Sequence, residues 1–228
     1  MRRLISALCA SALIALPIPA VAQISGTGGT APTSSSGTCT GPSYAVGAYA
    51  TALGNSSSGT AAMTAGVFAG YPLIVACKTL TVDKLQITVS TVAASGNVKL
   101  QIYANSAVNN ATGVAIASCN ISTASTGTTN CTLASPVTLV PGLYWIGGIP
   151  DSNAAGTAKF PNIQFYSLYT FYIAANGTNP NGPTGTGGAT VAATYSSSAD
   201  TDLTGTTMSQ NALGTVPIVS FHISAVSS

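Results

Sequence analysis

Residues 83–105 read DKLQITVSTVAASGNVKLQIYAN and hold the most regular alternation of apolar and polar side chains in the chain. Apolar residues stand at every second position from Leu85 to Val89 and again from Val98 to Ile102. Such alternation places one set of side chains on each face of a β-strand. The stretch AASGN between the two runs is rich in turn-forming residues. The segment therefore predicts a β-hairpin with one buried face and one solvated face.

Short apolar segments separated by turn residues continue on both sides of this segment. Further strands are predicted near 114–121 and 130–135, on either side of Pro141-Gly142, and over 216–224. No segment shows a sustained helical stripe of apolar residues. The many Thr and Val residues favour strands, whereas Gly, Asn and Ser favour turns. The pattern predicts an all-β fold, an antiparallel β-sandwich.

The first 22 residues have the order of a secretory signal peptide. Two arginines precede an apolar run from Leu4 to Leu16, and Ala20-Val21-Ala22 offers small residues for cleavage before Gln23. The apolar run is too short to cross a bilayer, and no later run is long enough. We expect a secreted protein, periplasmic or extracellular, without membrane insertion.

Three segments follow from these observations. Residues 1–22 are the predicted signal peptide, and residues 23–40, rich in Gly, Ser and Thr, predict a flexible lead-in. Residues 41–228 predict a single β-sandwich domain, because their length suits one large domain better than two.

The expected mature chain carries no net charge. Both arginines leave with the signal peptide, and the four lysines that remain balance the four aspartates. Nucleic-acid binding depends on phosphate electrostatics, and anionic lipid attracts polybasic patches. Neither partner fits this chain, so we expect no nucleic acid and no membrane surface as partner.

Four cysteines remain after the predicted cleavage, an even number in an oxidising compartment. Four cysteines allow three pairings. Cys119 and Cys131 flank a Ser/Thr/Gly stretch that reads as a hairpin turn, which favours pairing these two and pairing Cys39 with Cys77. The alternative is that these cysteines bind zinc, but no C-x-x-C spacing occurs, so we expect no metal site here.

The chain offers little for catalysis, and we expect neither an enzyme nor a cofactor. After cleavage it has no glutamate and no arginine, and His222 is the only imidazole that could act as a base. No G-x-S-x-G motif occurs. Asp200 and Asp202 could act as calcium ligands, although the full D-x-D-x-D-G loop is missing and a polar turn is the simpler reading.

Uncharged recognition remains chemically feasible, because sugar rings stack on aromatic side chains while amides and hydroxyls meet their hydroxyl groups. Neighbours on a strand face opposite sides, so at most one of Tyr144 and Trp145 is exposed. We expect Trp145 to fill the space between the sheets. The candidate ligand-binding residues are Tyr144, Tyr166, Tyr169 and Tyr172, and the alternative is that all four are packing residues.

The stretches YPLIVACKTLTVDKLQITVSTVAASGNVKLQIYAN, VTLVPGLYWIGGI and VPIVSFHIS occur in this order over residues 71–105, 137–149 and 216–224. Their pattern of strands and turns resembles the jelly-roll-like β-sandwich domains of phage tail-fibre and other virion-appendage proteins. That resemblance implies a jelly-roll-like sandwich that recognises surface glycans or serves as a structural module. The signal peptide, the cysteines and the lack of a fibrous repeat favour an exported bacterial protein that shares the domain.

The sequence thus predicts a secreted, non-catalytic binding module that recognises cell-surface or extracellular polysaccharide, similar to an adhesin or a tail fibre. The alternative is a structural subunit of an extracellular layer or filament, since neutral Thr-rich strands with unpaired edges self-associate readily. A homo-oligomer is compatible with either. A third, weaker option is a hydrolase that uses aspartates such as Asp151 or Asp200 on the same scaffold.

Overall fold

The structure is a computed structural model that describes residues 43–51, 56–107, 110–164, 189–210 and 216–227. The chain divides into two units, Met1–Pro32 and Thr33–Ser228, and every described residue belongs to the second. The predictions for the signal peptide and the lead-in lie outside the described residues. Among the described residues, no helix is long and apolar enough to cross a membrane.

The described part of the chain is all-β, as predicted, and every strand pairing within it is antiparallel. The strands are β1 (Tyr49–Ala50), β2 (Ser56–Ala62), β3 (Val67–Val75), β4 (Thr79–Val89), β5 (Asn97–Asn105), β6 (Ala111–Ser122), β7 (Gly127–Leu139), β8 (Gly142–Pro150), β9 (Lys159–Gln164), β10 (Ala189–Ala192), β11 (Ser209–Gln210) and β12 (Val219–Ser227).

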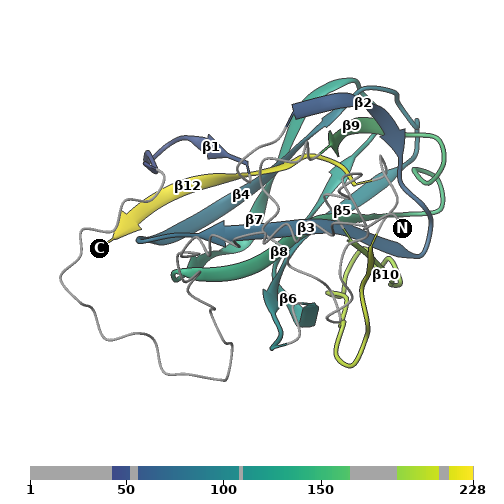
Figure 1. Ribbon diagram of the computed structural model, residues 1–228. Helices are drawn as coiled ribbons and strands as arrows, with labels where there is room; N and C mark the ends of the chain where they lie inside the picture. The colour runs from purple at the N-terminus through teal and green to yellow at the C-terminus, as the bar shows by residue number, and fades with distance from the viewer. Residues whose placement is uncertain (1–42, 52–55, 108–109, 165–188, 211–215, 228) are drawn as a thin grey trace, which may run out of the picture. The chain divides into compact units, whose positions relative to one another are not determined.

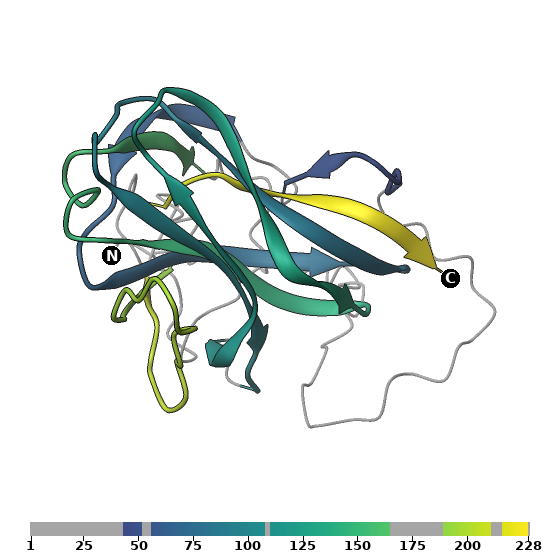
Figure 2. The ribbon, with the colours of Figure 1, turned by 180° about the vertical axis from the view of Figure 1, so that it is seen from behind.

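Two sheets form a β-sandwich (Figures 1 and 2). Sheet I has the strand order β1-β12-β4-β7, and sheet II has the order β11-β10-β3-β8-β5-β6. The strands β2 and β9 form a separate pair. Apolar side chains at alternate positions of both sheets meet in one core, among them Leu85, Ile87, Leu100, Ile102 and Phe221. The predicted β-sandwich is therefore confirmed.

The predicted hairpin over residues 83–105 is wrong, although both of its strands exist. Strand β4 pairs with β7 and β12 in sheet I, whereas β5 pairs with β6 and β8 in sheet II. The connection between β4 and β5 is hydrogen-bonded to the turn between β6 and β7. Ala93 N donates to the Thr123 carbonyl, and Thr123 N donates to the Gly96 carbonyl. The chain thus crosses between the sheets, and the two apolar faces pack against each other.

The turn between Cys119 and Cys131 also crosses between the sheets, so the predicted hairpin there is wrong as well. Strand β6 is an edge of sheet II and β7 is an edge of sheet I, and they share no ladder of hydrogen bonds. A disulfide between Cys119 and Cys131 joins them instead, with Cα atoms 5.8 Å apart. That predicted pairing is confirmed. Cys77 is also disulfide-bonded, but Cys39 lies outside the described residues, so this second pairing stays a prediction.

The second face of β5 is buried, whereas the alternation predicted it to be solvated. Lys99, Gln101 and Tyr103 are all sealed beneath residues 189–210, which lie on the outer side of sheet II. In Figures 1 and 2 this yellow-green segment lies below the sheet, on the side away from β12. The segment and the sheet enclose a second apolar cluster, which includes Phe68 and Met208.

Trp145 belongs to this second cluster. It is buried, as predicted, but on the outer side of sheet II rather than between the sheets. Its Nε1 donates to Asn105 Oδ1 at 2.9 Å, so the one polar atom of the indole is satisfied. Tyr144, its neighbour, packs against the core between the sheets. The two side chains do face opposite sides of the strand, as the alternation predicts. Which of them faces the space between the sheets is the reverse of the prediction, because residues 189–210, a distant part of the chain, cover the outer side of sheet II.

Candidate functional site

A row of polar side chains on β5 anchors the segment that covers sheet II. Lys99 is only 3% exposed, and its Nζ donates to the Ala199 carbonyl oxygen at 2.6 Å. The same Nζ lies 3.4 Å from Asp200 Oδ1. The Tyr103 hydroxyl lies 3.1 Å from the carbonyl oxygen of Thr201. Buried polar groups on the sheet thus hold consecutive residues of the cover in fixed positions.

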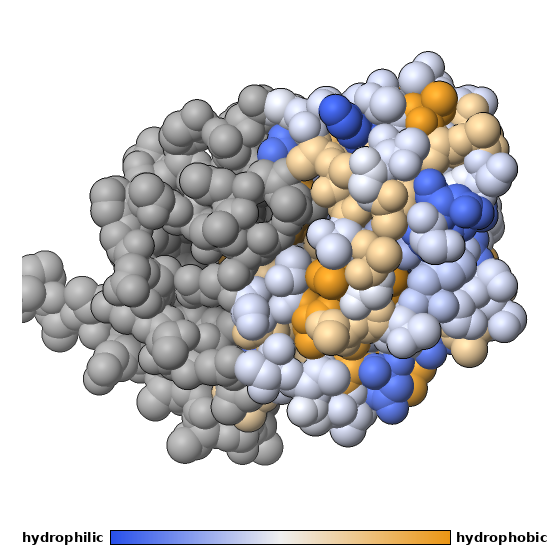
Figure 3. Space-filling model, turned by 90° about the vertical axis from the view of Figure 1, so that its right-hand side faces the viewer, coloured by the Kyte–Doolittle hydropathy of each residue, from blue (hydrophilic) through white to orange (hydrophobic). Residues whose placement is uncertain are grey.

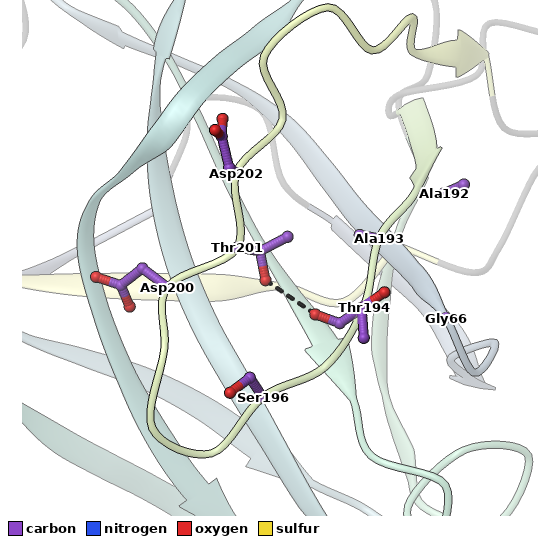
Figure 4. A pocket seen from close by; sticks show the side chains of 8 residues that line it. All are labelled: Gly66, Ala192, Ala193, Thr194, Ser196, Asp200, Thr201 and Asp202. Atoms are coloured by element: carbon purple, nitrogen blue, oxygen red, sulfur yellow. Dashed lines mark hydrogen bonds between the residues drawn. The ribbon is translucent and has the colours of Figure 1, made fainter.

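The anchored residues form one arm of a loop that follows β10. Residues 192–196 make the first arm and residues 200–202 the second, and Thr201 Oγ1 donates to the Thr194 carbonyl at 3.1 Å between them (Figure 4). The two arms and Gly66 surround a solvent-open hollow of about 540 Å³. We call it the loop hollow; its lining is Gly66 and residues 192–194, 196 and 200–202.

Two carboxylates line the loop hollow, and each is held by its own hydrogen bonds. Asp202 Oδ1 accepts from Thr204 N at 2.8 Å and from Thr204 Oγ1 at 2.6 Å, which lowers the pKa of Asp202. Asp200 accepts from Ser118 Oγ. Thr194, Ser196 and Thr201 are further polar residues of the lining, while the alanines and the glycine are small residues. The lining therefore offers hydrogen-bond acceptors and hydroxyls but no cationic side chain.

This geometry does not support the hypothesis that Asp200 and Asp202 bind calcium. Figure 4 shows the two carboxylates pointing away from each other, on opposite sides of Thr201. Each is already engaged by a neighbouring hydroxyl. In the part of the chain that the structure describes, no three His, Cys, Asp or Glu side chains gather as a metal-binding group.

Tyr103 makes the stability of this region dependent on pH. Burial raises the pKa of Tyr103, so the folded protein retains the phenolic proton above about pH 10, where an unfolded tyrosine loses it. The stabilising contribution is complete below the unfolded pKa and is lost as pH rises. We expect the urea midpoint of unfolding to fall as pH rises above about 10, and Tyr103→Phe to make that fall less steep.

Tyr144→Phe is the matched control, because replacing a less buried tyrosine should change the pH dependence of the midpoint less. If the two variants showed the same pH dependence, Tyr103 would not be its source.

Of the four tyrosines predicted to bind a ligand, the structure describes only Tyr144. Tyr144 is half-buried on β8, and its hydroxyl donates to the Val140 carbonyl at 3.0 Å. Burial raises the pKa of Tyr144. Tyr166, Tyr169 and Tyr172 lie outside the described residues. A ligand-binding role for these four residues stays a prediction.

The remaining candidate residues of the sequence, Asp151 and His222, do not line the loop hollow. Asp151 serves a turn, because its carboxylate accepts from the backbone N of Asn97, Asn153 and Ala154. His222 lies on the outer side of sheet I, where its Nδ1 is 2.5 Å from Asp83 Oδ1. The four aspartates thus lie in three separate environments: Asp151 in a turn, Asp83 in a pair with a histidine, and Asp200 and Asp202 at the loop hollow.

Comparison with known proteins finds no matching family model, no matching curated protein and no matching solved structure. The resemblance to virion-appendage domains therefore stays a prediction.

Proposed function

We propose that the chain is an exported, non-catalytic binding module that recognises a neutral saccharide unit of a cell-surface or extracellular polysaccharide. The observation that carries the proposal is the loop hollow, with two carboxylates and three hydroxyl-bearing residues around small side chains. Sugar hydroxyls donate well to carboxylates, and such charge-assisted hydrogen bonds are stronger than neutral ones. A hollow of this volume also falls in the range of small-molecule sites.

The loop hollow is organised before any ligand arrives. Asp202 is oriented by Thr204, and the second arm is tied to Lys99 and Tyr103 on the sheet. A ligand that meets preorganised groups does not have to offset the entropy of ordering them. Lys99 lies close enough to Asp200 to balance its charge, so the site does not require a cationic ligand.

We infer further that the sandwich is jelly-roll-like, which supports the resemblance drawn from the sequence. Counting β1, β3, β4, β5, β6, β7, β8 and β12 as the first to eighth strands, the sheets have the orders 1-8-3-6 and 2-7-4-5. An eight-stranded, two-sheet arrangement of this order is typical of jelly rolls, which occur in capsid and lectin domains.

Asp202→Asn tests the proposal with little disturbance of shape. The expected mature protein, residues 23–228, is screened on a glycan array, and the affinity for the best short saccharide is measured by calorimetry. Loss of a charged acceptor should weaken binding about tenfold or more. Ser198→Ala, on the same loop but outside the lining, is the control and should bind as the parent does. Saccharide binding that is equal in all three proteins would exclude the loop hollow.

The alternative function, a subunit of an extracellular layer or filament, is favoured by the two edge strands β6 and β7. Neither contains a charged residue, although charge is a common protection of sheet edges. The pairing of β7 with β4 is interrupted between Thr132 and Val137, however, and this stretch includes Pro136. Both features blunt an edge. Light scattering separates the two functions: large assemblies without saccharide binding would favour the structural role over recognition.

A further inference from the structure

The outer side of sheet I differs from the sealed outer side of sheet II, because its side chains reach solvent. Strand register places two transverse rows across β12, β4 and β7. Asn130 and Thr132 on β7 are exposed, and the row members on β4 and β12 are half-exposed. We call this surface the sheet I face; its rows are Ser220, Gln86 and Asn130, and His222, Lys84 and Thr132.

A β-bulge places an extra carboxylate on this face. Lys84 pairs with His222 and Val82 pairs with Ile223, so Asp83 is the additional residue between them. Val82 and Leu85 are buried, whereas Asp83 and Lys84 are both half-exposed, so two consecutive side chains point outward. Bulges re-aim side chains in this manner. Asp83 Oδ1 lies 2.5 Å from His222 Nδ1, which fixes the orientation of the carboxylate.

An aromatic ring borders the same cluster. Tyr49 on the short edge strand β1 pairs with His222, and the two ring centroids are 5.0 Å apart with an interplanar angle of 55°. The Tyr49 side chain is still 37% exposed. A partly exposed aromatic ring beside an oriented carboxylate suits a sugar, since C–H groups stack on the ring while hydroxyls donate to the carboxylate.

The charges of the sheet I face select the class of partner. Asp83 and Lys84 are adjacent and of opposite charge, and the other members of the two rows, apart from His222, are uncharged residues. A face without net charge gives no electrostatic advantage to nucleic acid or to an acidic polymer. Figure 3 shows another side of the molecule, where the coloured part is mainly pale and apolar residues with few strongly hydrophilic ones. Hydroxyls and amides therefore dominate what this face offers a partner.

We propose that the sheet I face is a second carbohydrate-binding surface, for a linear, uncharged polysaccharide that lies across β12, β4 and β7. One sugar ring packs on Tyr49 with its hydroxyls on Asp83, and the next units meet Gln86 and Asn130. The rows extend over three strands, about 10 Å at the usual strand spacing, which is longer than one sugar ring. The inference rests on the proposed function and narrows its ligand to a polymer.

Tyr49→Ala and Asn130→Ala test this surface directly. Binding of the expected mature chain to dextran, soluble starch, galactomannan and xyloglucan is measured by isothermal titration calorimetry, which does not depend on the charge of the protein. At least one polymer should bind the parent, and each substitution should weaken that binding about tenfold. Tyr49→Phe keeps the ring and should bind as the parent does. Val46→Ala removes an exposed apolar side chain outside the rows and serves as the matched control.

The outcomes separate this surface from the loop hollow. Loss of polymer binding in Tyr49→Ala with short-saccharide binding retained supports the sheet I face, provided that thermal unfolding is unchanged. Polymer binding that survives both Tyr49→Ala and Asn130→Ala but falls in Asp202→Asn overturns the inference and leaves the proposed function standing. A protein that binds neither short saccharides nor any of the polymers overturns both.

Discussion

Gly147→Ala is expected to destabilise the protein by about 3 kcal/mol or more. A Cβ atom at Gly147 would lie 2.1 Å from the Ala69 carbonyl oxygen and 2.5 Å from Gly70 Cα. Both are backbone atoms of β3, the strand that pairs with β8 through Gly70 and Gly147. A flexible side chain could turn away, but backbone cannot, so β3 and β8 would have to separate. The apolar clusters on both sides of sheet II would lose packing at the same time.

Two other glycines of β8 supply graded controls for this substitution. At Gly142 the nearest atom to an added Cβ is 3.7 Å away, an ordinary contact, so Gly142→Ala should leave stability nearly unchanged. At Gly148 the close atoms belong to side chains, the nearest being Val98 Cγ1 at 3.0 Å, so an intermediate loss is expected. The urea unfolding midpoint should be highest for Gly142→Ala, intermediate for Gly148→Ala and lowest for Gly147→Ala. Equal midpoints for the Gly142 and Gly147 variants would show that the two strands can adjust.

The strands with a clear alternation of apolar and polar residues were predictable because that signal is local. Alternation over five residues, as in 85–89 and 98–102, is enough to set one face of each strand against an apolar layer. Alternation does not say which strand is the neighbour, and a turn-rich connection is as compatible with a crossing as with a hairpin. The hairpin prediction over 83–105 fails for this reason, since both arrangements bury the same apolar side chains.

The candidate sites were less predictable, because both depend on distant pairs. Lys99 and its acceptor Ala199 are 100 residues apart, and no sequence pattern around Lys99 indicates that a later loop covers it. Asp83 and His222 are 139 residues apart and meet only because of the one-residue bulge in β4. One signal is present in the sequence: Asp200 and Asp202 are the only closely spaced carboxylates, a pattern that indicates calcium ligands or a polar turn before it indicates a saccharide site. Cys119 and Cys131 were paired correctly because they are only 12 residues apart.

Removal of the Cys119–Cys131 disulfide is expected to cost about 3 kcal/mol, the second large effect. The bond closes a loop with a sequence separation of 12, and without it the unfolded chain gains the conformational entropy of that loop. In the folded protein it also ties the free edge of sheet II to that of sheet I, where no ladder joins β6 to β7. Replacing both cysteines with serine should lower the urea midpoint, and the slope of the transition should reveal any change in the unfolded state.

The control for the disulfide is Thr126→Ala, an exposed position in the same turn that leaves the bond intact and should unfold as the parent does. Replacing both cysteines rather than one avoids a free thiol that could pair with Cys77 and confuse the result. If the double variant were as stable as the parent, packing between the sheets alone would hold the two edges together. The disulfide would then be dispensable for the stability of the sandwich, and packing against the apolar core would be enough to hold the edge strands β6 and β7 in place.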